Sequence, residues 1–362
     1  MYSVGRSRCV ERGFGRLIGV VTLMGLALSV VATAQIRDIE RGGGLDRPFV
    51  RARTRIVAKP KPVKPVKPVK PKANGSKPVP VVDEDPESIS ISPEATKRYE
   101  AGRRAYEKGN FETAVTEFEA AIRLESRYVD ALIDLGDAYF DMSDVENAAD
   151  SYKRALVVDK KNIDARNRVG RASFARRDYD EALRQYTEVL KISPDDPEAI
   201  YNIALTYKGL KRYSDAIPYF EKAIAARQGP FPQARVNLSR SYFESGKRDE
   251  AEAAARQAIS EIGAESQASA TAWYALATAL NGKPDLPGAT DALQKAISVC
   301  KDCPNDEQSR YFLSLAQILE SRGLRTQAAD AYERFVLLAP FMPDHQIQEF
   351  RAKIAKLRAE PS

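Results

Sequence analysis

Two cysteines three positions apart, Cys300 and Cys303 in "VCKDCPND", are the residues whose type and spacing could do chemistry. Such a C-x-x-C pair can be a thiol redox centre, a haem-attachment site, half of a zinc site or a structural disulfide. Haem attachment needs a histidine directly after the second cysteine, where this chain has Pro304. Zinc needs two further ligands, and His345 is the only histidine of the chain. A redox centre and a structural disulfide therefore remain, and we predict the disulfide between Cys300 and Cys303, because a redox C-x-x-C usually needs a thioredoxin-like βαβ context.

The rest of the sequence lacks the motifs of common enzymes. It contains no H-E-x-x-H, G-x-S-x-G or P-loop pattern, and no G-x-G-x-x-G that follows a strand. A single histidine at the start of an exposed helix, as predicted for His345, is no argument for catalysis. The chain is predicted not to be an enzyme and to bind neither a cofactor nor a metal ion. The enzymatic alternative is a thiol-disulfide oxidoreductase that uses Cys300 and Cys303.

The net charge of +6 is distributed unevenly along the chain. Residues 1–34 carry +3 and residues 35–80 carry +10, which leaves −7 for residues 81–362. A nucleic-acid-binding fold is expected to carry its positive charge on a folded face. We therefore predict no nucleic-acid partner.

Residues 1–34 have the features of an export signal. Four arginines flank the start of an uncharged apolar run, Leu17–Val31, and Ala32-Thr33-Ala34 matches an A-x-A cleavage site before Gln35. The alternative is an uncleaved N-terminal membrane anchor, because an apolar run of about 18 residues reaches the lower limit for a span. Both interpretations place the rest of the chain in the bacterial periplasm, or anchored in the inner membrane and facing the periplasm.

Residues 35–92 are predicted to be a disordered basic linker rich in proline and lysine. Its centre, Lys59–Lys72, reads "KPKPVKPVKPVKPK". Proline at every second or third position removes backbone donors and fixes φ, which favours an extended polyproline II chain. At about 3.1 Å per residue this run spans about 40 Å. We interpret it as a stiff spacer, although its lysines could also bind an anionic surface such as phospholipid, lipopolysaccharide or cell wall.

Beyond Ser92-Pro93, an N-cap followed by proline at the first helical position, the sequence repeats with a period near 34. An alanine recurs, a small residue stands twelve positions before it, and a bulky residue stands four positions after it in all units but the fifth, which has Ala255. Two amphipathic helices can approach closely where small side chains meet, and a bulky side chain fills the space beside them. The alanines are Ala114, Ala148, Ala182, Ala216, Ala251, Ala289 and Ala328; the small residues are Gly102, Gly136, Gly170, Ala204, Ser239, Ala277 and Ala316; the bulky ones are Phe118, Tyr152, Tyr186, Phe220, Leu293 and Tyr332.

This pattern resembles the tetratricopeptide repeat family, most clearly in "ALIDLGDAYFDMSDVENAADSYKRALVVD" and "AIYNIALTYKGLKRYSDAIPYFEKAIA". The resemblance implies an all-α fold, a right-handed α-solenoid of about seven helix-turn-helix repeats over residues 93–342. Residues 343–362, with Ile347, Phe350, Ile354 and Leu357 at helical spacing, are predicted to form a C-terminal capping helix. The repeats start near Ala95, Val129, Ile163, Pro197, Pro232, Ala270 and Ser309, and Gly109, Gly246 and Gly323 fall where the first helix must turn into the second.

In the resembling family the first helix of each repeat lines a concave groove. Side-chain amides there can bond the backbone of an extended peptide, arginines can pair with its carboxylates, and aromatic rings can take its apolar side chains. The resemblance therefore implies a protein or peptide partner. The residues at matching offsets are Arg103, Tyr106, Asn167, Arg171, Phe174, Tyr201, Asn202, Asn237, Arg240 and Phe243.

The predicted function is thus a non-enzymatic protein-protein interaction scaffold of the cell envelope. The alternative is a structural tether, in which Lys59–Lys72 binds an anionic cell wall or membrane and the repeats only assemble. Deletion of residues 59–72 would separate the two interpretations.

The cysteine pair yields the first prediction. Cys300 and Cys303 are the only cysteines that follow the export signal, and thiols outside the cytoplasm tend to oxidise. We expect neither thiol to react with an alkylating reagent in protein purified from the export compartment, and both to react after reduction. A disulfide here would raise the free energy of unfolding by about 2 kcal/mol, because it lowers the entropy of the unfolded chain. Two thiols that are free before reduction would contradict it.

Overall fold

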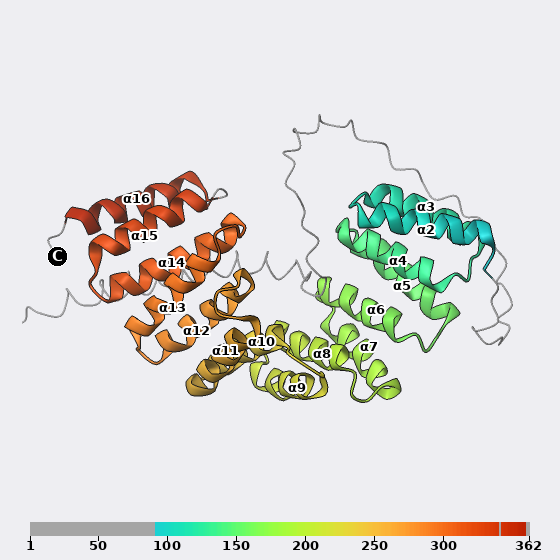
Figure 1. Cartoon of the computed structure of the whole chain (residues 1–362), viewed down its shortest axis with the longest axis horizontal. Helices are drawn as coiled ribbons and strands as arrows, with labels where there is room; N and C mark the ends of the chain where they lie inside the picture. The colour runs from blue at the N-terminus through green and yellow to red at the C-terminus, as the bar shows by residue number, and fades with distance from the viewer. Residues whose placement is uncertain (1–90, 340–341, 360–362) are drawn as a thin grey trace, which may run out of the picture. The chain divides into compact units, whose positions relative to one another are not determined.

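The computed structural model describes residues 91–339 and 342–359, so the predicted signal and nearly all of the predicted linker lie outside it. The described part is entirely helical, with 15 α-helices and one short 3-10 helix, η2 (Gln267–Ser269). The helices follow one another in chain order as seven pairs and a last single helix (Figure 1). This confirms the predicted all-α repeat array. None of the described helices is both long and apolar enough to cross a membrane.

Each pair consists of a first and a second helix that pack against each other. The first helices begin at, or within four residues of, the predicted repeat starts. They are α2 (Pro93–Glu107), α4 (Val129–Asp141), α6 (Ile163–Ala175), α8 (Pro197–Gly209), α10 (Pro232–Glu244), α12 (Ala270–Gly282) and α14 (Asn305–Ser321). The second helices are α3 (Phe111–Leu124), α5 (Val145–Val158), α7 (Tyr179–Ile192), α9 (Tyr213–Ala226), α11 (Arg248–Ile262), α13 (Leu286–Val299) and α15 (Arg325–Leu338).

Local sequence signals set the ends of these helices. The Ser92 hydroxyl accepts a hydrogen bond from the backbone N–H of Ala95 at 3.3 Å, as expected for an N-cap. The turn inside each pair falls at one offset, where Gly109 has a φ of 72° and Gly246 a φ of 81°. Glycine adopts this left-handed conformation without a steric cost. In the third pair Arg177 occupies the same offset with a φ of 63°, so a side chain is accommodated there at some strain.

The two helices of a pair approach most closely where the predicted small and bulky residues meet. A Cβ atom added to Gly102 would lie 2.6 Å from the Phe118 ring, and one added to Gly170 would lie 2.5 Å from the Tyr186 ring. The seven repeating alanines are all fully buried. In the fifth pair, which lacks the bulky residue, the Ser239 hydroxyl instead donates to the backbone carbonyl of Ala251 at 2.7 Å.

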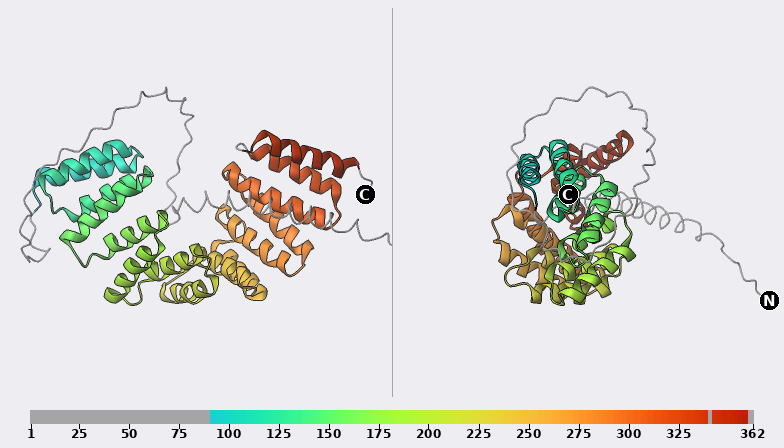
Figure 2. Two further views of the ribbon diagram at one scale, coloured as in Figure 1. Left: turned by 180° about the vertical axis from the view of Figure 1, so that it is seen from behind. Right: turned by 90° about the vertical axis from the view of Figure 1, so that its right-hand side faces the viewer.

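Each second helix also packs on the first helix of the next pair, and the views of Figure 2 show the same succession. The last helix, α16 (Asp344–Ala359), packs on α15 in the way that a further first helix would. Ile354 and Leu357 are buried against the preceding pair, and Phe350 stacks on Tyr332 and Phe335 at 5.7 and 5.0 Å between ring centroids. The helix thus covers the apolar end of the seventh pair, as a cap must.

The contact between Gly170 and Tyr186 gives the second prediction. Gly170→Ala should lower the free energy of unfolding by about 1–3 kcal/mol, because the added methyl group overpacks the ring. In a Tyr186→Leu background the same substitution should cost less, since the pair would then match Ala277 and Leu293 of the sixth repeat. Chemical denaturation of the four variants of this cycle measures the coupling. If the free-energy costs of Gly170→Ala and Tyr186→Leu were simply additive, a direct contact between the two residues would be contradicted.

Candidate functional site

All ten residues predicted to line a groove lie on first helices, at four shared offsets from the repeat starts. The first helices of neighbouring pairs contact one another between α2 and α4, α6 and α8, α8 and α10, and α10 and α12. We call the surface formed by these side chains the first-helix face. The ten residues are Arg103 and Tyr106 on α2, Asn167, Arg171 and Phe174 on α6, Tyr201 and Asn202 on α8, and Asn237, Arg240 and Phe243 on α10.

A buried aspartate on α4 organises the third repeat's part of this face. Asp137 is only 5% exposed and accepts a hydrogen bond from the Tyr152 hydroxyl at 2.7 Å. Its two oxygens accept from Nε of Arg168 at 3.0 Å each, and Oδ1 also accepts from a terminal nitrogen of Arg171 at 3.0 Å. Burial and the charge of Asp137 raise the pKa of the Tyr152 hydroxyl. Two guanidinium groups thus share the Asp137 carboxylate, and the carboxylate of Asp134 on the same helix also lies close enough to interact with Arg168.

Two predicted residues beside this cluster have polar atoms without partners. Asn167 is 4% exposed, and its Oδ1 has no hydrogen bond within the described part of the chain. Nε of Arg171 is buried and unpartnered in the same way, while the guanidinium lies 4.5 Å from the centre of the Phe140 ring. A buried polar group without a partner costs about 1–3 kcal/mol. A ligand that bonded these atoms would remove this cost.

The two asparagines at one offset of successive repeats have different surroundings. Asn237 is 9% exposed; its amide nitrogen donates to the Tyr201 hydroxyl at 2.9 Å and to the Gln233 carbonyl at 3.0 Å. Its Oδ1 accepts from Nζ of Lys208 at 2.9 Å. The side chain of half-buried Asn202, in contrast, has no hydrogen bond among the described residues. Of these two asparagines, Asn202 is therefore the one whose amide is not engaged by the described part of the chain.

The remaining predicted residues contact their neighbours in ways that leave part of each side chain accessible. Exposed Arg103 pairs with Glu107 at 3.9 Å, and the Tyr106 hydroxyl donates to Asp141 at 2.5 Å. The ring of Phe174 meets Tyr179 edge-on at 5.5 Å between centroids. The ring of Phe243 lies 3.9 Å beneath the Arg248 guanidinium, and Arg240 is half-buried nearby on α10.

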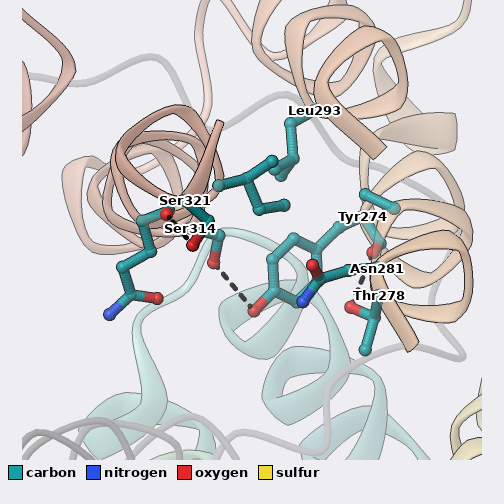
Figure 3. Close-up of a pocket in the computed structure, with 9 residues that line it drawn as sticks. Tyr274, Thr278, Asn281, Leu293, Ser314 and Ser321 are labelled. Atoms are coloured by element: carbon teal, nitrogen blue, oxygen red, sulfur yellow. Dashed lines mark hydrogen bonds between the residues drawn. The ribbon is translucent and has the colours of Figure 1, made fainter. Parts of the chain in front are cut away.

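Sequence reasoning missed a pocket of about 210 Å³ between α12 and α14 (Figure 3). Its lining combines apolar side chains with hydroxyl and amide groups. Tyr274, Thr278 and Asn281 stand at the same offsets as the predicted residues of earlier repeats, so the offsets alone could have identified them. The lining residues are Tyr274, Ala277, Thr278, Asn281, Leu293, Ser314, Gln317, Ile318 and Ser321.

Cys300 and Cys303 lie side by side between α13 and α14, with Cα atoms 5.2 Å apart, within the range that a disulfide spans. Both are buried, at 0% and 8% exposure. Glu307 offers a carboxylate oxygen within 4.8 Å of both sulfurs, but this residue accepts a hydrogen bond from Tyr311 at 2.5 Å. These three groups fall short of the four ligands of a structural zinc site.

Known proteins resemble this chain in sequence pattern and in fold. Three models of the tetratricopeptide repeat match residues 99–166, 170–211 and 207–280. A tetratricopeptide repeat protein from Parabacteroides merdae is 19% identical, and the match covers 73% of this chain and 100% of that one with a TM-score of 0.56. The C-terminal part of a repeat protein from Cytophaga hutchinsonii is 14% identical, with 70% and 98% covered and a TM-score of 0.50. At these identities the two structures show the fold alone. No curated protein matches the chain in sequence.

The Asp137 cluster gives the third prediction. Asp137→Ala should lower the free energy of unfolding by about 2–4 kcal/mol, because it leaves Tyr152 and two guanidinium groups without their shared acceptor. Asp150→Ala, an exposed position on the neighbouring helix α5, should change it by less than about 0.5 kcal/mol. Urea denaturation followed by circular dichroism measures both. Equal effects of the two substitutions would refute the structural role of Asp137.

Proposed function

Because the chain is a tetratricopeptide repeat protein, we propose that its first-helix face binds an extended segment of a partner protein. Proteins of this family mediate protein-protein interactions and are typically not enzymes. A right-handed solenoid would present the first helices of successive repeats as one continuous groove. A stacked array exposes such a surface over many repeats, whereas no single pair of helices could form it.

One observation supports this proposal above the others, namely the unpartnered polar atoms of Asn167 and Arg171. Oδ1 of Asn167 is buried in this structure, so the side chain would have to turn toward the first-helix face before Oδ1 could accept a hydrogen bond from a backbone N–H of an extended peptide. The Arg168 and Arg171 guanidinium groups retain nitrogens beyond those that bond Asp137, and their shared charge favours a carboxylate. The geometry thus favours a peptide that places an acidic side chain over α6.

We further propose that this scaffold works in the cell envelope. The export features of residues 1–34 support a location in the periplasm or at the periplasmic face of the inner membrane. The Lys/Pro-rich residues 35–92 would then set the distance between the repeats and the membrane, whether or not their lysines also touch an anionic surface.

The fourth prediction tests the face directly. Crosslinking in intact cells, followed by mass spectrometry, should recover an envelope protein with the full-length chain, and Arg171→Ala should reduce its yield severalfold. The matched control is Arg184→Ala on α7 of the same repeat. This exposed side chain lies on a second helix and, among the described residues, pairs with Glu181 alone.

Arg171→Ala leaves Asp137 bonded to Arg168 and Tyr152, so the array should remain folded, which circular dichroism verifies. If Arg171→Ala recovered the same partners in the same yield, the proposal that the first-helix face binds the partner would be wrong. Exclusively cytoplasmic partners would count against the proposed envelope location.

A further inference from the structure

The pocket between α12 and α14 lies where other repeats have a tyrosine ring of their own. In the second and third repeats the rings of Tyr152 and Tyr186 fill the space against Gly136 and Gly170. The corresponding pair in the sixth repeat is Ala277 and Leu293, and both of these residues line the pocket. Leucine is shorter than tyrosine, so the outer part of the space that a tyrosine ring would occupy remains open to the first-helix face.

The volume of the pocket indicates the size of its occupant. About 210 Å³ exceeds a cavity of roughly 150 Å³, which is enough to admit a benzene ring. It falls below the range of roughly 300–1,000 Å³ of sites for small-molecule ligands and cofactors. The pocket is therefore suited to one ring-sized side chain.

The lining of the pocket indicates the chemistry of that side chain. Ala277, Leu293 and Ile318 supply the apolar part of the lining, and no lining residue carries a charge. The hydroxyl oxygens of Tyr274 on α12 and Ser314 on α14 contact each other at 3.4 Å (Figure 3). An unpaired charge would lose its hydration here without compensation, so a neutral ring is favoured.

One lining residue stands where a phenol hydroxyl would need an acceptor. In the second repeat the Tyr152 hydroxyl donates to Asp137, at the eighth position after the repeat start. Thr278 holds the same offset in the sixth repeat. Its hydroxyl donates to the Tyr274 carbonyl at 2.9 Å, which leaves the lone pairs of the oxygen available.

From these observations we propose that the pocket receives a tyrosine side chain of the partner segment, with its ring on Leu293 and Ile318 and its hydroxyl at Thr278. This inference rests on the proposed function, because it assumes that the segment runs along the first-helix face. It adds one position at which the partner must carry a tyrosine. Hydrogen bonds to the peptide backbone could not specify this residue, because the backbone is the same in every sequence.

The fifth prediction uses p-cresol, the isolated tyrosine side chain, as the probe. Titration into the full-length protein with labelled leucine and isoleucine methyl groups should shift the Ile318 signal saturably. Leu293→Tyr gives the sixth repeat the alanine-tyrosine pair that the seventh repeat has in Ala316 and Tyr332. It should weaken this binding more than about tenfold, because the ring of the chain itself then fills the pocket. Leu293→Phe should act similarly. Leu337→Tyr, the same exchange at a residue that is 71% exposed on α15, should leave binding unchanged.

The proposed tyrosine site would be overturned if the wild-type protein did not bind p-cresol. It would also be overturned if Leu293→Tyr left the affinity for p-cresol unchanged. Partner capture in cells should also fall with Leu293→Tyr, and capture that is unaffected would equally overturn the proposal. Circular dichroism shows whether each variant is folded. A failure of the pocket can be distinguished from a failure of the groove, because the p-cresol titration involves no partner and the Arg171→Ala comparison leaves the pocket intact.

Discussion

The described array depends on one contact, the close approach of the two helices of each pair at a small residue. At Gly102 and Gly170 the ring of the second helix occupies the place where a Cβ atom would stand. Helices that approach this closely have little freedom to slide or rotate, because the interior is packed at crystal density. The contact therefore determines which offsets of the first helix point away from the pair. The composition of the first-helix face follows from it.

Where this contact departs from its usual form, the surface changes as well. In the fifth repeat Ser239 and Ala255 leave no ring, and a hydrogen bond from the serine to the backbone of α11 holds the helices instead. In the sixth repeat Leu293 stands where most other repeats have an aromatic ring, and the pocket lies beside this shorter side chain. A repeat can therefore exchange internal packing for an open pocket through one residue.

The period near 34 was sufficient to predict the helices, their pairing and the helix that carries each candidate residue. It could do so because the small and bulky residues of a contact lie only sixteen positions apart, as Gly170 and Tyr186 do. The Asp137 cluster was not predictable, since its arginines lie 31 and 34 positions away and their rotamers decide the pairing. The pocket could not be predicted in the same way, because it arises where Leu293 is shorter than the aromatic ring at this offset of other repeats. Leu293 fits the pattern of bulky residues, and only packing shows that it is too short.

Hydrogen bonds and ion pairs between neighbouring first helices make some parts of the first-helix face more rigid than others. Tyr99 donates to Asp134 at 3.0 Å, Tyr106 donates to Asp141, and Asp137 holds Arg168 and Arg171, so three first helices are linked through the acidic side of α4. Burial raises the pKa of Asp134, a sign that this side is partly closed to water. Between α12 and α14 the hydrogen bonding among the described residues is one long contact of 3.4 Å between two hydroxyl groups, beside the rings of Tyr274 and Tyr311, whose centroids are 5.2 Å apart. A preorganised surface loses little entropy when it orders a peptide, whereas a looser one can adjust to a side chain that enters it. If the first-helix face binds a peptide segment as proposed, the first three repeats would orient this segment, and the sixth and seventh would select it.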